Sequence, residues 1–182
     1  MSSTILTISK ITAGYKIPVI RDYSLSLNSG DRIGLHGKNG SGKSTLLRAI
    51  VGIAHCFSGT IVKSTNLKIA YLVQYQPEIE ELSITGRDCF YALVNRAVAI
   101  PDYLLSYIDL RLDQMSTGQR QLLKALSLLH SDADLFLFDE PSSSLDDLAK
   151  DFLVKSLQAL DKNKTTLIIS HDRDFLTRVS TT

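Results

Sequence analysis

The stretch that decides the fold is Gly37-Lys38-Asn39-Gly40-Ser41-Gly42-Lys43-Ser44, which matches the pattern G-x-x-x-x-G-K-[ST]. A short apolar strand is predicted before it, at Arg32 to Leu35, and a helix after it, from Ser44 to Val51. The glycines let the backbone turn tightly and bring N–H groups against phosphate oxygens, and the helix adds the positive end of its dipole. The sequence therefore predicts a loop that binds nucleotide phosphates over Gly37–Thr45.

The two residues at the end of this motif have separate predicted roles. Lys43 reaches the β- and γ-phosphates as a mobile charge, and the hydroxyl of Ser44 ligates Mg²⁺. The alternative is a glycine-rich loop that carries an exposed lysine. The complete match, placed between a strand and a helix, favours the phosphate-binding interpretation.

A second motif is a buried strand that ends in two carboxylates, Asp139 and Glu140. Four consecutive large apolar residues, Leu135 to Phe138, are typical of the middle of a parallel sheet, and such strands direct their carboxyl ends toward the ligand. Asp139 is predicted to hold Mg²⁺ through water, and Glu140 to act as the general base toward the attacking water. The alternative, an acidic turn after a core strand, is less favoured because the phosphate loop is also present.

Strands and helices alternate along the rest of the chain, which predicts an α/β domain with a mostly parallel sheet covered on both faces. One domain is expected over residues 1–182, with a small helical subdomain at about 77–115 in which helical spacing runs to Pro101. An N-terminal edge strand is expected from Ile5 to Thr12. Further elements are predicted at Tyr23–Leu27, Ile69–Val73, Thr117–His130, Asp147–Leu160 (Leu148 inward) and Thr166–Ile169.

Bulk composition excludes several functions. The chain has 182 residues and a formal net charge of +1, so charge gives no argument for direct DNA readout. Its two cysteines, Cys56 and Cys89, do not define a disulfide framework. The N-terminus does not resemble a signal peptide, and no apolar run approaches the roughly 18 residues that span a bilayer. A cytoplasmic location is expected, and any membrane work would fall to a partner chain.

With these motifs in this order, the chain resembles the nucleotide-binding domain of ABC (ATP-binding cassette) ATPases over nearly all its length. The resemblance implies a P-loop NTPase fold with N-terminal antiparallel strands, ATP and Mg²⁺ as ligands, and ATP hydrolysis. Ser116-Thr117-Gly118-Gln119 after Met115 is similar to the family's LSGGQ signature, and departs from it at Met115 and Thr117. The signature would contact the γ-phosphate of an ATP held by a second subunit. The alternative is a plain helix N-cap at Ser116.

The resemblance assigns roles to further residues. Gln74 would sense Mg²⁺ and the γ-phosphate, Tyr15 would stack on adenine, and His171 would be the switch histidine that contacts the γ-phosphate. Ser144 to Asp146 resembles the D-loop, which contacts the opposite subunit, although Asp146 can also cap a helix. Taken alone, Tyr15 could be a turn aromatic and His171 a structural or surface residue.

The family geometry implies two cassettes packed head to tail, as a homodimer or a heterodimer. One hypothesis is the ATP-binding subunit of a transporter, held at the inner face of the membrane by a membrane-spanning partner. The alternative is an ABC-F-like ribosome-associated or antibiotic-protection factor, which Gly30–Gly34 and Ser170–Leu176 resemble. Pro141–Ser144 and the missing linker to a second cassette argue against it. A third possibility is a fragment or a structural module, which Lys43 and the intact carboxylates make less attractive.

Overall fold

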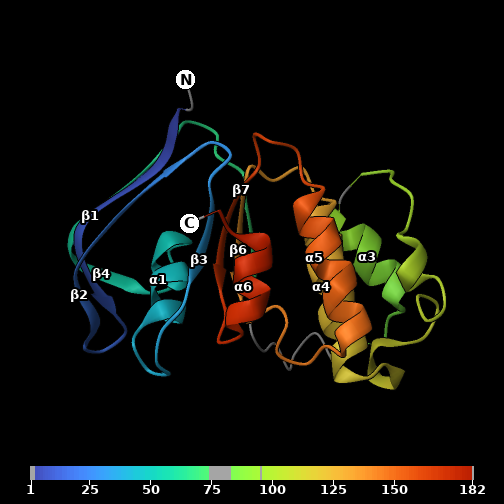
Figure 1. Cartoon of the computed structure of the whole chain (residues 1–182). Helices are drawn as coiled ribbons and strands as arrows, with labels where there is room; N and C mark the ends of the chain where they lie inside the picture. The colour runs from blue at the N-terminus through green and yellow to red at the C-terminus, as the bar shows by residue number, and fades with distance from the viewer. Residues whose placement is uncertain (1–2, 74–82, 95, 182) are drawn as a thin grey trace.

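The computed structural model describes residues 3–73, 83–94 and 96–181. Within them the chain forms two sheets flanked by helices (Figure 1). The elements, in order, are β1 (Thr4–Gly14), β2 (Pro18–Asn28), β3 (Arg32–Leu35), α1 (Lys43–Ile50), β4 (His55–Lys63), β5 (Ile69–Leu72), α3 (Gly86–Val94), the 3₁₀ turns η1 (Asp102–Leu104) and η2 (Leu112–Gln114), α4 (Thr117–Leu129), β6 (Leu135–Asp139), α5 (Asp147–Gln158), β7 (Thr165–Ile169) and α6 (Arg173–Val179).

The central sheet is parallel and has the strand order β3-β7-β6-β5. Every residue of β6 and β7 is buried, because apolar layers cover both faces. Side chains alternate between the layers: Leu135 and Leu137 join the core under α1 and β1, whereas Phe136 and Phe138 join the core under α3 to α6. This confirms the predicted α/β class and explains why β6 reads as a continuous apolar run.

The antiparallel sheet has the order β2-β1-β4, so β1 lies in its middle. The prediction of an edge strand at Ile5 to Thr12 was wrong, since alternation of side chains reports which faces are buried and not how many neighbours a strand has. The partner on the second side is β4, which the sequence analysis missed. Nearly all of β4 is exposed, so it carries little hydrophobic signal.

The helical subdomain differs in detail from its prediction. Helix α3 ends at Val94, well before Pro101, and Val98 lies outside it. Phe90 and Val94, two of the apolar residues whose spacing predicted a helix in this range, are buried. Hydrogen bonds from Gly86 N to Leu110 O (2.9 Å) and from Arg87 N to Ile108 O close the segment after α3 back onto its start. Part of the predicted range 77–115 lies outside the described residues, and its status as a subdomain stays a prediction.

Helix α5 contradicts one predicted contact. Leu148, expected to face inward, is 75% exposed, whereas Leu153 and Leu157 are buried. Asp146 caps the helix by accepting a hydrogen bond from Ala149 N at 2.8 Å, as the alternative interpretation of this aspartate expected. Among the described residues, none of the helices is long and apolar enough to cross a membrane.

Candidate functional site

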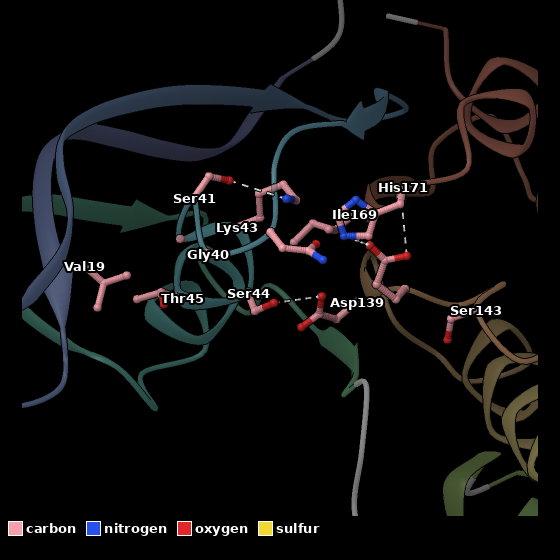
Figure 2. A pocket seen from close by; sticks show the side chains of 13 residues that line it. Val19, Gly40, Ser41, Lys43, Ser44, Thr45, Asp139, Ser143, Ile169 and His171 are labelled. Carbon is pink, nitrogen blue, oxygen red and sulfur yellow. Dashed lines mark hydrogen bonds and ion pairs between the residues drawn. The ribbon is translucent and has the colours of Figure 1, made fainter.

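Three parallel strands end at one edge of the sheet and deliver the candidate site. Leu35 pairs with Ile169, and Asp139 pairs with the same residue from the other side. The chain leaves β3 into the glycine-rich loop, β6 into Glu140, and β7 into the segment that holds His171. These segments line a pocket of about 470 Å³, with Val19 and Ser143 also on its wall (Figure 2). Sequence reasoning gave no signal for those two residues.

Backbone conformation explains the glycines of the loop. Gly42 is the N-cap of α1 and has φ +90°, and a Cβ at this position would lie 2.2 Å from Ile20 Cγ2 on β2. Gly40 also has a positive φ, of +78°. Helix α1 begins at Lys43, one residue earlier than predicted. The loop can therefore adopt this path only with glycine at its tightest point.

The Lys43 ammonium group is held by the loop itself. Its Nζ donates to Gly37 O at 2.7 Å and to Lys38 O at 2.9 Å, with Ser41 Oγ at 3.4 Å. Lys38, Asn39 and Thr45 complete the predicted stretch, and the latter two line the pocket. The ammonium group thus sits at the mouth of the loop, where an anion bound by the loop amides would meet a fixed positive charge.

Ser44 and Asp139 meet across the pocket in a geometry suited to a hard cation. Ser44 Oγ donates to Asp139 Oδ1 at 3.0 Å, while Asp139 Oδ2 is buried without a hydrogen-bond partner among the described residues. Burial raises the pKa of the Asp139 carboxyl, and the hydrogen bond from Ser44 opposes that rise. A hydroxyl and a carboxylate with an unsatisfied oxygen fit Mg²⁺, which binds one or two carboxylates together with phosphate oxygens.

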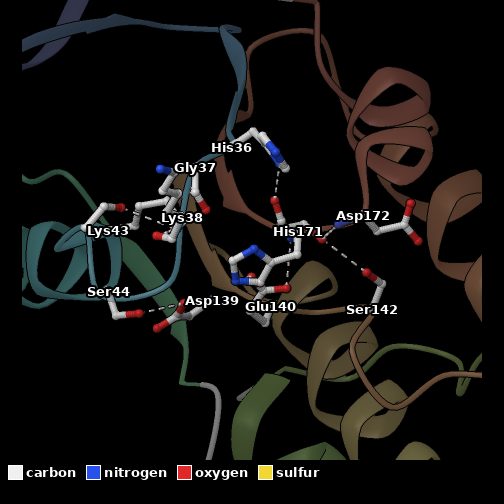
Figure 3. Close-up of polar contacts among 12 residues, drawn as sticks. His36, Gly37, Lys38, Lys43, Ser44, Asp139, Glu140, Ser142, His171 and Asp172 are labelled. Atoms are coloured by element: carbon white, nitrogen blue, oxygen red, sulfur yellow. Dashed lines mark hydrogen bonds and ion pairs between the residues drawn. The ribbon is translucent and has the colours of Figure 1, made fainter.

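Glu140 and His171 form a pair at the end of β6 and β7 (Figure 3). His171 N donates to Glu140 Oε2 at 3.2 Å, and the His171 Nε2 atom lies 3.1 Å from Oε1. The Glu140 side chain is only 9% exposed, and its backbone adopts φ +53°. A left-handed backbone costs about 1–2 kcal/mol for a residue with a side chain. Such strain persists where the surroundings enforce it, often at functional sites.

A second histidine joins this cluster and was missed by sequence reasoning. Arg173 Nε donates to His36 Nε2 at 3.1 Å, so that nitrogen must accept, and His36 Nδ1 donates to Ser170 O at 3.2 Å. Ser170 Oγ, fully buried, lies 3.5 Å from Ser142 Oγ. The one available signal for His36 was its place directly before the glycine-rich loop.

The remaining predicted residues lie elsewhere. Tyr15 is 47% exposed and accepts a hydrogen bond from Arg48 Nη1 at 2.7 Å; it is not among the described residues that line the pocket. Its stacking role stays a prediction. Gln74 lies outside the described residues, so its predicted role as a sensor and metal ligand has no structural account here.

The signature-like segment borders a different pocket, of about 640 Å³, together with Ser144 to Asp146. Ser116 Oγ accepts from Gln119 N at 3.1 Å, and Gln119 Oε1 accepts from Ser116 N at 2.9 Å, so the two residues form a capping box for α4. Thr117 is exposed. A Cβ on Gly118 would lie 2.5 Å from Ser144 O. Among the residues that the structure describes, none lines both this pocket and the phosphate-loop pocket of the same chain.

Known proteins match this chain throughout. The family model described as ABC transporter matches residues 20–143. The ribosome protection protein VmlR of Bacillus subtilis is 32% identical over 90% of the chain and 27% of its own length. The zinc import ATP-binding protein ZnuC of Ehrlichia chaffeensis is 28% identical over 97% of the chain and 77% of its own length.

The first curated relatives are longer proteins, of which the chain spans 28–34%. A solved dimer of an ATP-binding cassette in a post-hydrolysis state, bound to ADP and Pi, shares the fold with a TM-score of 0.78 at 19% identity, over 96% of this chain and 91% of that one. The family match agrees with the phosphate loop, the acidic strand end and the signature-like segment found in the sequence. The chain belongs to the ABC transporter family of ATP-binding cassettes and is an ABC-type ATPase domain, a hydrolase of ATP.

Proposed function

We propose that the chain binds Mg-ATP at the phosphate loop and hydrolyses it with Glu140 in a head-to-tail pair of cassettes that drives a membrane transport partner. One observation carries the proposal. The phosphate loop and the Glu140–His171 pair share one pocket, while the signature-like segment borders another. A single chain would leave its signature away from its own nucleotide, so a second cassette completes each site.

The residues divide the chemistry between them. The loop amides and the Lys43 ammonium group bind the β- and γ-phosphates, and Ser44 with Asp139 would hold Mg²⁺, which neutralises charge on the phosphate oxygens. Glu140 accepts a proton from the attacking water. The backbone N–H and the imidazole of His171 fix the Glu140 carboxylate in place, at 3.2 Å and 3.1 Å. Because the Glu140 side chain is only 9% exposed, bulk water has little access to the carboxylate and competes little with the attacking water for it.

Association of two cassettes would depend on ATP. The exposed Ser116 and Thr117 sit at the positive end of the α4 dipole, which suits a phosphate presented by a second chain. Bound ATP would then contribute contacts to both chains and favour the closed pair. Hydrolysis and loss of phosphate remove those contacts and allow the pair to open.

The coupled process has two candidates. Similarity to import ATPases such as ZnuC supports a cytoplasmic cassette docked on a membrane subunit. Similarity to VmlR, together with the residues of Gly30–Gly34 and Ser170–Leu176, supports a ribosome-associated role instead. Sedimentation of the Glu140→Gln chain with ribosomes separates them: retention with ATP and release without it would favour the ribosome, and no retention would favour transport.

The Glu140→Gln substitution tests the assigned base. Turnover should fall by roughly 10²-fold or more, since a positioned general base contributes about that much. ATP binding should persist, and an ATP-bound pair should accumulate. The matched control is Asp161→Asn, the same carboxyl-to-amide change at an exposed position, which should leave turnover unchanged. Hydrolysis by Glu140→Gln at the wild-type rate would refute Glu140 as the base.

A further inference from the structure

The backbone of Glu140 is held from two sides. Its N–H donates to Ile169 O on β7 at 2.9 Å. Its carbonyl oxygen accepts from Gln121 Nε2 on α4 at 3.3 Å, and also from Ser143 N at 3.3 Å within the turn. Because Glu140 has φ +53°, a conformation that a residue with a side chain adopts only when its surroundings impose it, these bonds determine where its carboxylate points.

Gln121 is a buried polar residue that links α4 to the main chain of Glu140. The residue is 8% exposed, and it lies on the second turn of α4, the helix that begins with the signature-like segment. A buried amide needs hydrogen-bond partners, and here one partner is the main chain of the proposed base. Gln121 is five residues after Ser116, or about 7–8 Å along the helix axis. The same rigid helix thus touches both the signature and Glu140.

The turn after Glu140 is also packed against α4. Gly118 approaches Ser144 so closely that a Cβ would meet its carbonyl oxygen at 2.5 Å. On the other side, Ser142 Oγ lies 3.5 Å from Ser170 Oγ, next to the switch histidine. A displacement of α4 therefore cannot leave the turn that carries the base unchanged.

We propose that Gln121 is a positioning residue that maintains the left-handed backbone of Glu140 and couples the signature end of α4 to the base of the same chain. Contact of the signature with a phosphate on a second cassette then changes the alignment of this chain's own carboxylate, so each site responds to the state of the other. Such coupling is reciprocal between two binding events. The inference rests on the proposed role of Glu140 as base.

Two substitutions test the role of Gln121. Gln121→Met keeps the length of the side chain and removes the donor, and Gln121→Glu replaces the donor with an acceptor that repels the Glu140 carbonyl. Both should lower kcat by about tenfold or more, as expected for a displaced catalytic group, while KM and the Kd for ATP stay within about twofold. A merely structural residue would change stability and ATP binding without this separation of kcat from KM.

The matched control is Ser127→Ala on the same helix. Ser127 is fully buried, and its hydroxyl donates to Leu123 O within α4 at 2.7 Å. Its loss should lower stability comparably and leave kcat unchanged. Equal effects of Ser127→Ala and Gln121→Met on kcat would mean that a general loosening of α4, and not the bond to Glu140, is responsible.

Amide hydrogen exchange gives a readout that needs no turnover. In Gln121→Met, the amides of Glu140 and His171 should exchange about tenfold faster, because the turn they belong to opens more often; in Ser127→Ala they should not. Unchanged exchange in Gln121→Met would overturn the proposal. If Glu140→Gln turned over normally, only the base assignment would fail; if Glu140→Gln were inactive and Gln121→Met normal in both assays, only the positioning role would fail.

Discussion

Asp139 combines deep burial with a carboxylate that is only partly hydrogen-bonded. The residue is 1% exposed, and one of its carboxylate oxygens has no hydrogen-bond partner among the described residues. A buried charge without full pairing destabilises the folded chain. The hydrogen bond from Ser44 offsets part of this cost. A cation bound between Ser44 and Asp139, as proposed above, would offset the rest.

The substitution Asp139→Asn separates the destabilising effect of the buried charge from the proposed binding of Mg²⁺. Without Mg²⁺, the melting temperature should rise, because the buried negative charge is gone. With Mg-ATP, the stabilisation seen in the wild-type chain should largely disappear, since ligand stabilisation scales with affinity and is about 2.7 kcal/mol at a hundredfold excess over Kd. Thermal unfolding with and without Mg²⁺ and ATP measures both. If Mg-ATP stabilised the Asp139→Asn variant as much as the wild-type chain, Asp139 would be excluded as a ligand of Mg²⁺. The control is Asp161→Asn.

Some site residues could be predicted from the sequence and others could not. Lys43, Asp139 and Glu140 could be named because phosphate chemistry requires these residue types next to a strand end. Gln121 and His36 could not be named, because their hydrogen-bond partners lie 19 and 134 residues away in the chain. No local sequence pattern indicates such contacts. Their roles depend on tertiary packing that only the folded structure reveals.

At the scale of elements, α5 offers a direct test of its buried face. Leu153 is fully buried in the core under the sheet, whereas Leu148 is 75% exposed on the same helix. Leu153→Ala should cost about 2–5 kcal/mol through lost burial and the cavity left behind. Leu148→Ala should change stability by less than about 0.5 kcal/mol.

Denaturant unfolding of the two variants measures the difference. Because both variants carry the same Leu-to-Ala change in helix propensity, each is the control of the other. A large loss in Leu148→Ala would mean that this leucine packs on another surface in solution. In that case its position two residues after Asp146, next to the D-loop-like turn, would make it a contact between cassettes.

Helices and strands could be predicted where their burial gives the apolar residues a recognisable pattern in the sequence. β6, β7, α4 and α5 were placed within about two residues, because each carries a continuous apolar run or a helical repeat. β4 was missed because its exposed residues show neither pattern. The β1 position in the sheet was misjudged, since strand order depends on which distant segments pair and not on local alternation.

For the molecule as a whole, the separation of the two pockets is the feature with the widest consequence. The described residues place the phosphate loop and the signature-like segment around different cavities. ATP turnover per chain should therefore depend on how often two cassettes meet. Thr117, which stands where the family signature has glycine, is exposed at the surface that would receive the second nucleotide.

Thr117→Gly tests whether this side chain hinders the pair. In a Glu140→Gln background with ATP, the variant should associate at a protein concentration roughly tenfold lower, because removing the branched side chain allows the α4 amides to approach the phosphate; tenfold corresponds to about 1.4 kcal/mol. Sedimentation velocity over a concentration series measures it. Thr117→Ser, which removes only the methyl group, should fall between the two, and Gly118→Ala should abolish association by displacing Ser144.

Equal association of the threonine and glycine forms would mean that Thr117 does not face the second nucleotide. Absence of ATP-dependent association in all forms would show that the chain pairs with a different cassette. The two outcomes are distinguishable, because a heterodimeric cassette would still bind ATP at its own phosphate loop. Its turnover would then stay independent of its own concentration and rise only when the second cassette is added.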